Sequence, residues 1–310
     1  MSDSENTRSQ IDNFHPRLHG IREDVKYGMY SGIRLYHNTN TIKFDEHWHT
    51  ALEILYPLVN SYTVRLDSNE YLVKAGDILV IAPGTIHSYT PPESGERIFL
   101  LVDYSNLESI PSIRNIIQAI RPYVLISQDA YPPLNQMLRE ILDFVIDEYD
   151  ESGPYTDALV LSKIVEFLVY IGRTDIYRAT HTKSFTNDNR QEYIAKFMEV
   201  CNYITEHISE DITVDQLAAV AGFSKFHFSR IFKSLAGMPC HEYLIQRRLE
   251  VAEQLLADPN ISITDVAMRS GFNSISTFSR IFKEEKNITP SAYRKITQDD
   301  PSYYLQDGNH

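Results

Sequence analysis

One hexapeptide occurs twice in the last third of the chain. Phe-Ser-Arg-Ile-Phe-Lys occupies residues 228–233 and recurs unchanged at residues 278–283, fifty positions later. A repeat at this spacing indicates a duplicated supersecondary unit. Each copy follows a short amphipathic stretch that ends near a glycine, Gly222 or Gly271. Two short helices joined by a glycine-containing turn of three or four residues are typical of a helix-turn-helix, so the repeat predicts two such units.

The ends of the predicted helices carry local signals. Thr213 can cap the first helix of the first unit, and Ser262 or Thr264 that of the second, because a hydroxyl oxygen accepts hydrogen bonds from first-turn amides. Glycine suits the left-handed conformation that ends many helices. Between the units, residues 240–257 predict a longer helix of about 27 Å. Such a rod can hold two recognition helices about 34 Å apart, which is one turn of DNA.

The second helix of each unit has an apolar and a polar face. The apolar face should pack into the core and comprises Phe228, Ile231 and Phe232, then Phe278, Ile281 and Phe282. The other face suits DNA, because arginine binds guanine O6 and N7 with two donors and lysine meets phosphates. The candidate DNA-binding residues are Ser224, Lys225, Phe226, Ser229, Arg230 and Lys233 in the first copy and Ser274, Ile275, Ser276, Ser279, Arg280 and Lys283 in the second.

Residues 190–297 resemble the DNA-binding domain of the AraC/XylS family of bacterial transcription regulators. The resemblance lies in the second copy from Gly271 through the hexapeptide to residues 289–294, Thr-Pro-Ser-Ala-Tyr-Arg, and in residues 224–228 of the first. It implies base-edge contacts by Phe226, Ser229 and Arg230, and by Ile275, Ser276, Ser279 and Arg280. The second helix is expected to read fewer bases than the first, because Ile275 and Ser276 are short. A repeat that served packing alone would not explain two exposed arginines at one helical phase.

The N-terminal half is rich in strand-forming runs. Residues 32–102 alternate such runs with Gly, Pro and Asn, as in an all-β barrel. Two segments resemble the two cupin motifs: His47-Trp48-His49 with Glu53 four residues later, and residues 76–87, which end at His87. Alternate strand residues share a face, so these three histidines and Glu53 are expected to converge inside the barrel. Three imidazoles and a carboxylate suit Zn, Fe, Mn or Ni.

The two cupin-like motifs leave two interpretations open. The sequence departs from the cupin enzyme pattern at Thr41, where a glycine is expected, and at Ala82, where a proline is expected. The AraC resemblance implies a barrel that binds a small effector instead of running catalysis. His47, His49, Glu53 and His87 are therefore candidate metal ligands or, together with Trp48 and Tyr56, candidate effector-binding residues. Trp48, Tyr56 and Tyr62 can stack on a sugar ring or belong to the core.

The rest of the chain completes the predicted organisation. Residues 105–172 contain two amphipathic helical patterns, which serve either as a subunit interface or as an intramolecular lid. The fold class is α+β with two domains. The predicted parts are a cupin-like barrel with flanking helices (1–172), a polar linker (173–190), an all-α domain with two helix-turn-helix units (191–297) and a polar tail (298–310).

Composition limits the environment and the partners. The net charge is −13, yet residues 190–297 hold 13 basic and 13 acidic residues, so the acidic excess lies elsewhere and disfavours non-specific DNA binding. There is no run of 18 apolar residues and no apolar signal segment, so we expect no membrane span and a cytoplasmic protein. Cys201 and Cys240 fit structural thiols in a reducing compartment.

Three hypotheses follow from these patterns. The first is a transcription regulator that is not an enzyme and needs no cofactor, with double-stranded DNA, a small-molecule effector such as a carbohydrate and a second copy of itself as partners. RNA polymerase joins these partners if the regulator is an activator. The second is a metal-dependent cupin enzyme fused to a DNA-binding domain. The third is a regulator without an effector, whose barrel only dimerises.

Overall fold

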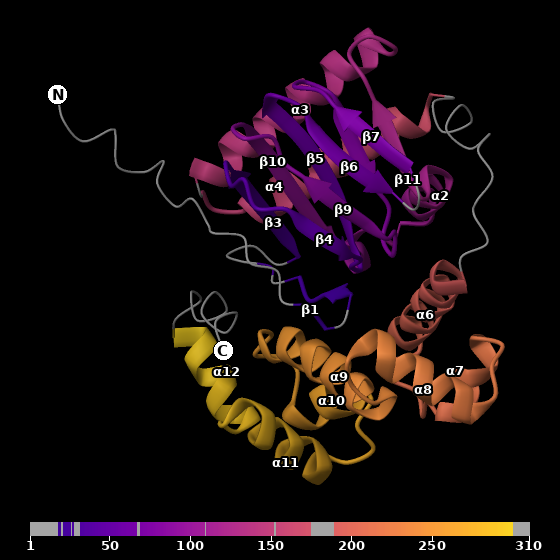
Figure 1. Cartoon of the computed structure of the whole chain (residues 1–310). Helices are drawn as coiled ribbons and strands as arrows, with labels where there is room; N and C mark the ends of the chain where they lie inside the picture. The colour runs from indigo at the N-terminus through magenta and orange to yellow at the C-terminus, as the bar shows by residue number, and fades with distance from the viewer. Residues whose placement is uncertain are drawn as a thin grey trace. The chain divides into compact units, whose positions relative to one another are not determined.

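The computed structural model describes residues 18–19, 21–25, 27, 32–66, 69–108, 110–151, 153–174 and 189–299 of the chain. The chain divides into two compact units, Met1–Gln191 and Glu192–His310 (Figure 1). Most of the predicted linker and nearly all of the predicted tail lie outside the described residues. No helix in the described part of the chain is long and apolar enough to cross a membrane.

The first unit is built on two antiparallel sheets. Its strands are β1 (Leu18–His19), β2 (Arg22–Glu23), β3 (Ile33–Asn38), β4 (Phe44–His47), β5 (Ala51–Val59), β6 (Tyr62–Leu66), β7 (Asn69–Val73), β8 (Ile78–Ile81), β9 (His87–Thr90), β10 (Glu96–Asp103) and β11 (Tyr123–Ile126). One sheet has the order β11-β8-β5-β10-β3 and the other the order β4-β9-β6-β7, while β1 and β2 pair with each other. The predicted strand-rich domain is confirmed, with its strands in separate sheets instead of one closed barrel.

The core of the first unit contains side chains from both sheets. The five-stranded sheet contributes Leu55, Leu79, Ile81 and Phe99, and the four-stranded sheet contributes Phe44, Val64, Leu66, Val73 and Tyr89. These residues form one cluster, so the two sheets face each other across it. Burial of such apolar area is the main term that stabilises the arrangement. Glu53 lies two residues before Leu55 on β5, so its side chain points from the same face.

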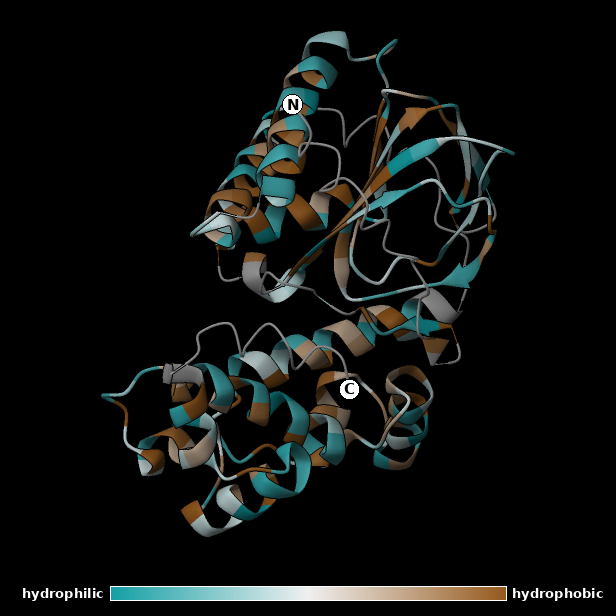
Figure 2. Ribbon diagram, turned by 90° about the vertical axis from the view of Figure 1, so that its left-hand side faces the viewer, coloured by the Kyte–Doolittle hydropathy of each residue, from teal (hydrophilic) through white to brown (hydrophobic). Residues whose placement is uncertain are grey.

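The described part of the first unit also contains helices after β10, with β11 between the second and the third of them. They are α1 (Tyr104–Glu108), α2 (Pro111–Ile120), α3 (Pro132–Glu151) and α4 (Thr156–Gly172). The two amphipathic helices expected between residues 105 and 172 correspond to α3 and α4, which pack against each other. The side chain of Asn135 on α3 donates to the carbonyls of Gly76 and Ile126, at 2.9 and 3.0 Å, and so attaches α3 to the five-stranded sheet. Figure 2 shows these helices alongside the strands.

The second unit consists of helices. They are α6 (Asn189–Glu206), α7 (Val214–Val220), α8 (Lys225–Ala236), α9 (Cys240–Leu256), α10 (Ile263–Arg269), α11 (Ile275–Lys286) and α12 (Pro290–Asp299). The pairs α7–α8 and α10–α11 are the two predicted helix-turn-helix units, and α9 is the predicted rod between them. Thr213 caps α7 in a capping box with Gln216, and Ser262 caps α10. Of the two caps proposed for α10, the one at Ser262 is therefore used.

The repeat forms equivalent contacts in both units. Phe228 and Phe232 of α8 are buried, as are Phe278 and Phe282 of α11. The α11 pair packs with Leu249, Ala252 and Leu256 of α9, with Val266 and Ala267 of α10, and with Phe272 and Tyr293. Because α9 contacts both α8 and α10, one helix supports both copies of the repeat.

The turn of each unit contains a glycine in the left-handed region. Gly222 has a φ of 70° and Gly271 a φ of 89°. Only glycine adopts this region without steric cost. Their surroundings differ, because a methyl group on Gly271 would overlap the backbone carbonyl oxygen of Ile208, whereas one on Gly222 would find Lys196 Nζ at 3.5 Å as its nearest neighbour. The Ile208 carbonyl also accepts from Arg248 Nε at 3.3 Å, which holds it in place.

Candidate functional site

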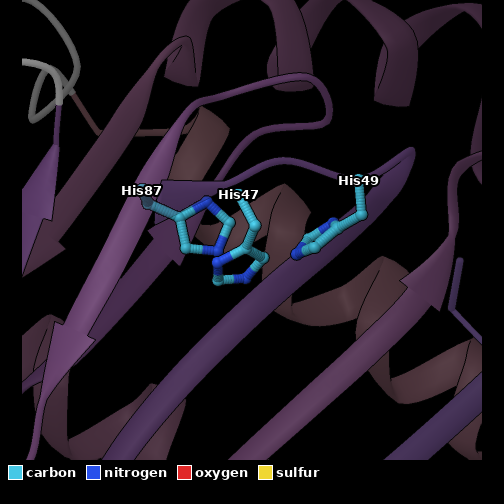
Figure 3. A group of neighbouring side chains, drawn as sticks. All are labelled: His47, His49 and His87. Carbon is cyan, nitrogen blue, oxygen red and sulfur yellow. The ribbon is translucent and has the colours of Figure 1, made fainter. Parts of the chain in front are cut away.

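Three histidines converge at one end of the core of the first unit. His47 ends β4 and His87 begins β9, and the two residues face each other directly in the antiparallel register. His49 lies just before β5. All three are buried, and a ring nitrogen of each lies within 4.8 Å of those of the other two. Figure 3 shows the three rings turned toward one region. The predicted convergence of these histidines is therefore what the fold produces.

Each imidazole uses its Nδ1 atom on the backbone. His47 Nδ1 is 2.9 Å from the Asp45 carbonyl, His49 Nδ1 is 3.2 Å from the Ala51 carbonyl, and His87 Nδ1 is 2.9 Å from the Thr85 carbonyl. A carbonyl oxygen only accepts, so the partner assigns the proton to Nδ1 in every ring. In a neutral imidazole the Nε2 atom then carries a lone pair, and each Nε2 faces a carboxylate.

Glu53 joins the histidines from β5. Its Oε2 atom is 2.6 Å from His49 Nε2 and 3.2 Å from His87 Nε2, and its Oε1 atom accepts a hydrogen bond from the Tyr89 hydroxyl at 2.6 Å. Burial alone would raise the pKa of Glu53, but the neighbouring His87 and His49 hold it well below its ordinary value. Burial, and then the charge of Glu53, raises the pKa of Tyr89 well above normal, so its hydroxyl remains a donor.

A second carboxylate belongs to the same cluster. Glu23 of β2 is buried, and its Oε2 atom lies 3.4 Å from His47 Nε2. Burial, reinforced by Glu53, raises the pKa of Glu23 to about 8. Burial, with His87 and His49 next in importance, lowers the pKa of His47 well below its usual value. The cluster therefore combines three imidazoles with two carboxylates in a region closed to water.

The sequence motifs did not identify Glu23 or Tyr89 as part of this cluster, and the reasons differ. Glu23 precedes the histidine motif by more than twenty residues and lies on a two-residue strand, so no spacing marks it. The backbone of Trp48 brings it into place, since the Trp48 N–H donates to the Ile21 carbonyl and its carbonyl accepts from the Glu23 N–H. Tyr89, in contrast, follows His87 by two residues on one strand, and this parity would have predicted it.

The aromatic residues proposed for effector binding lie elsewhere. Tyr56 is three residues from Glu53 on β5 and so points from the opposite face, where its hydroxyl accepts from Arg139 Nε of α3 at 3.0 Å. The Tyr62 ring is buried and lies 4.4 Å below the Arg97 guanidinium. Trp48, which separates His47 from His49 in the sequence, is fully buried. Of the six candidate effector-binding residues, the structure gathers His47, His49, Glu53 and His87.

The polar face of α8 is open to solvent. Phe226 is 89% exposed, and all the other candidates on this helix and its cap are exposed: Ser224, Lys225, Ser229, Arg230 and Lys233. Ser224 is the N-cap, and its hydroxyl accepts from the His227 amide. Lys225 Nζ forms an ion pair with Asp215 at 2.8 Å. The structure thus presents one continuous face of small, aromatic and basic side chains.

The equivalent face of α11 is less free. Ile275, Ser276, Arg280 and Lys283 are exposed, while Ser274, the N-cap, and Ser279 are half-buried. Arg280 Nη1 donates to both carboxylate oxygens of Glu284. At the corresponding position of α8 stands Ser234, and no carboxylate pairs with Arg230 in the part of the chain that the structure describes. The two copies therefore share a geometry but differ in the charge they offer.

The two units match two family descriptions. An AraC-like ligand-binding domain matches residues 30–168, and a helix-turn-helix domain matches residues 217–296. The chain belongs to the AraC family of transcription regulators. The AraC-type arrangement expected from the sequence, a ligand-binding domain followed by a helix-turn-helix domain, is thereby confirmed.

Individual proteins resemble parts of the chain. The Probable transcription factor PqrA of Proteus vulgaris is 42% identical over 87 residues, which are 28% of this chain and 71% of that protein. An uncharacterized HTH-type transcriptional regulator of Staphylococcus aureus (strain COL) is 33% identical over 136 residues, which are 44% of this chain but only 17% of that longer protein. The solved DNA-binding domain of AdpA, in complex with a target DNA, is 34% identical, with a TM-score of 0.33, and the match covers 34% of this chain and 94% of that one.

Proposed function

We propose that this AraC-type regulator binds double-stranded DNA through α8 and α11 and that a small molecule bound by its first unit changes this binding. One observation supports the DNA contact most strongly. Each of the two helices buries a phenylalanine pair and exposes an arginine at the same helical phase, Arg230 or Arg280. Burial on one side fixes the orientation of each helix, so the other side is presented as a rigid reading surface.

The chemistry of α8 supports base and phosphate contacts. Arg230 carries the fork of donors that suits guanine O6 and N7, and the exposed ring of Phe226 suits a thymine methyl group. Lys225 and Lys233 lie near the ends of the exposed face, where lysines meet phosphates. We expect this helix to enter a major groove with Phe226, Ser229 and Arg230 at the base edges.

The length of α9 supports the proposal that both helix-turn-helix units read one DNA site. Its 17 residues correspond to about 25 Å, and it contacts both helix-turn-helix units. We propose that α8 and α11 occupy successive major-groove segments of one site, whose two parts lie about one helical turn apart. The second part is expected to be read less strictly, because Arg280 is paired with Glu284 and Ser276 is short.

The first unit is proposed to bind the effector at the buried cluster. His47, His49, Glu53 and His87 are the polar groups that the fold gathers there. Sugars are the first organic class to screen, followed by other small polar molecules. Binding there would shift the population of states that bind the promoter.

A second copy of the chain and RNA polymerase are the remaining proposed partners. The surface of α3 and α4 carries Met137, Phe144 and Leu159, which are 39%, 39% and 40% exposed. Met137 and Phe144 are seven residues apart and share a helix face. Lys163 Nζ lies 5.3 Å from the Phe144 ring, which places this face beside α4. We propose that this patch is a homodimer interface, and that the protein contacts RNA polymerase if it activates transcription.

Genome-wide footprinting with purified protein, with and without pooled sugars, tests the proposed function. We expect bipartite sites with parts about one turn apart. Arg230→Ala should weaken specific binding by about 1–3 kcal/mol, while Arg65→Ala, an equal loss of charge at the exposed position of β6, should not. Unchanged binding by Arg230→Ala would contradict the assignment of the reading face. No specific site under any condition would contradict the proposed DNA contact.

A further inference from the structure

We propose that His47, His49, His87 and Glu53, with Glu23 as a ligand from outside the motif, bind a divalent first-row transition-metal ion. This inference deepens the proposed ligand binding by the first unit, on whose location it rests, and it does not depend on DNA binding. It names the class of ligand and adds a residue that the histidine motif does not contain.

The hydrogen bonds of the three histidines leave their Nε2 atoms available to a metal ion. Because all three Nδ1 atoms face backbone carbonyls, each neutral imidazole presents an Nε2 lone pair. These Nε2 atoms face carboxyl oxygens at 2.6 Å for His49, 3.2 Å for His87 and 3.4 Å for His47. Without an ion, each of these short contacts needs a proton, either on the imidazole or on the carboxyl group. A single divalent cation would take the place of those protons and convert all three contacts into ligand bonds.

The distances fit such an ion. Metal–nitrogen and metal–oxygen bonds are about 2.0–2.2 Å, so neighbouring ligand atoms around one ion stand roughly 3 Å apart. The three carboxylate–Nε2 distances lie close to this value. The ring centroids of His47 and His87 are 4.2 Å apart, and those of His49 and His87 are 5.1 Å apart. Small rotations of the rings would therefore complete the coordination.

The surrounding contacts are those that metal ligands use. A metal-binding histidine usually donates its other ring N–H to a carbonyl or carboxylate, which fixes both tautomer and orientation. All three histidines have this contact, and the Tyr89 hydroxyl likewise orients Glu53. Tyr56 and Arg139, on the opposite face of β5, take no part.

Charge balance explains the role of Glu23. With both carboxyl groups ionised and all three imidazoles neutral, as metal ligands must be, the cluster would carry two negative charges, which a divalent ion would neutralise. Burying two unpaired carboxylates is costly, and a buried ion pair is tolerated only when each charge is compensated. Five protein ligands leave little room for a substrate, so the site would serve sensing or stability instead of catalysis.

Metal binding by the full-length protein tests the proposal. The protein is purified with a tag that lacks histidine, stripped with EDTA, and titrated separately with Zn²⁺ and Co²⁺. We expect about one equivalent of either metal, a visible Co²⁺ absorption band and a rise in Tm, because a ligand that binds only the native state stabilises it. His49→Gln and His87→Gln should abolish the band, and Glu23→Gln should weaken binding at least tenfold. Circular dichroism checks that each variant is folded.

His37→Gln is the matched control. His37 lies on β3 of the same unit, is partly exposed, and has Glu96 and Asp150 nearby, yet it is remote from the cluster in the hydrogen-bond network. It should bind metal like the unmodified protein. Absence of stoichiometric binding, or binding that survives the cluster substitutions, would overturn the proposal. Unchanged affinity in Glu23→Gln would remove Glu23 from the ligand set. A Tm shift with a sugar but with no metal would overturn this inference and leave the proposed function intact.

Discussion

Arg280 Nη1 donates to both carboxylate oxygens of Glu284, at 3.0 and 2.9 Å. Arg230 occupies the same position in the first copy of the repeat, and Ser234 stands where Glu284 stands. Exposed pairs of this spacing stabilise a helix by only about 0.3–0.5 kcal/mol. The pair therefore adds little to folding, but it neutralises an arginine on the proposed DNA-reading face and adds an acidic group beside it.

An exchange of these two positions should redistribute DNA affinity between the helices. Glu284→Ser should strengthen specific binding about two- to fivefold, because it frees Arg280 and removes a charge that repels phosphate. Ser234→Glu should weaken binding by a similar or larger factor, because it pairs Arg230. Fluorescence anisotropy with a labelled site measures both changes at fixed salt. Equal affinities for the two variants would contradict the proposed asymmetry.

The two turn glycines should differ in their tolerance of alanine. Gly222→Ala should cost about 1–2 kcal/mol, since its left-handed backbone strains any side chain but space is available. Gly271→Ala should cost about 3 kcal/mol or more, because the Ile208 carbonyl must also move. Urea unfolding followed by circular dichroism compares the two. Similar losses would show that the carbonyl moves freely despite its hydrogen bond from Arg248.

Both cysteines should be unreactive in the folded protein. Cys201 and Cys240 are free and buried, and burial, with Cys201 nearby, raises the pKa of the Cys240 thiol to about 12. Only the thiolate attacks disulfide reagents, so at pH 8 roughly one Cys240 side chain in ten thousand is reactive. Raising the pH to 9 should increase this fraction tenfold and still leave it small. Labelling with a chromogenic disulfide should give two thiols after denaturation, and rapid labelling before it would contradict the assignment.

The apolar patch on α3 and α4 should control self-association. Phe144→Asp places a charge in the proposed interface and should raise the dimer dissociation constant at least tenfold, which corresponds to about 1.4 kcal/mol. Sedimentation velocity over a concentration series measures this. Leu72→Asp, a change at an exposed apolar residue on β7, is the control and should leave association unaltered. A protein that is monomeric without any substitution would refute the interface outright.

Local sequence signals accounted for the second unit almost completely. The caps at Thr213 and Ser262, the two turn glycines and the phenylalanine spacing are all set by residues within a few positions of one another. The pairing of Arg280 with Glu284 was equally accessible, since residues four apart on a helix are neighbours. Position 284 lies one residue beyond the hexapeptide that the two copies share, so the repeat itself does not point to the pair.

The candidate site of the first unit depends more on contacts between residues that are far apart in the sequence. His47, His49 and Glu53 do converge, but they do so across two sheets, because His47 ends β4 and Glu53 lies on β5, so parity along a single strand is not the cause. The cross-strand pair of His47 with His87 follows from the fold. Parity along β5 places Tyr56 on the other face, so its assignment beside the histidines could have been questioned from the sequence. Glu23 could not have been found in this way, because hydrogen bonds to the distant Trp48 backbone position it.

The helix α9 contacts both helix-turn-helix units, and under the proposed double reading this sets a rule for any site that both units read. A helix advances about 1.5 Å and turns about 100° for each residue, whereas DNA turns about 36° for each base pair. Adding or removing one base pair between the two parts of the site would therefore rotate one part away from its helix. If both units read one site, the spacing of its two parts would follow from the length of a single protein helix, and a comparison of spacings would recognise such sites before any base is known.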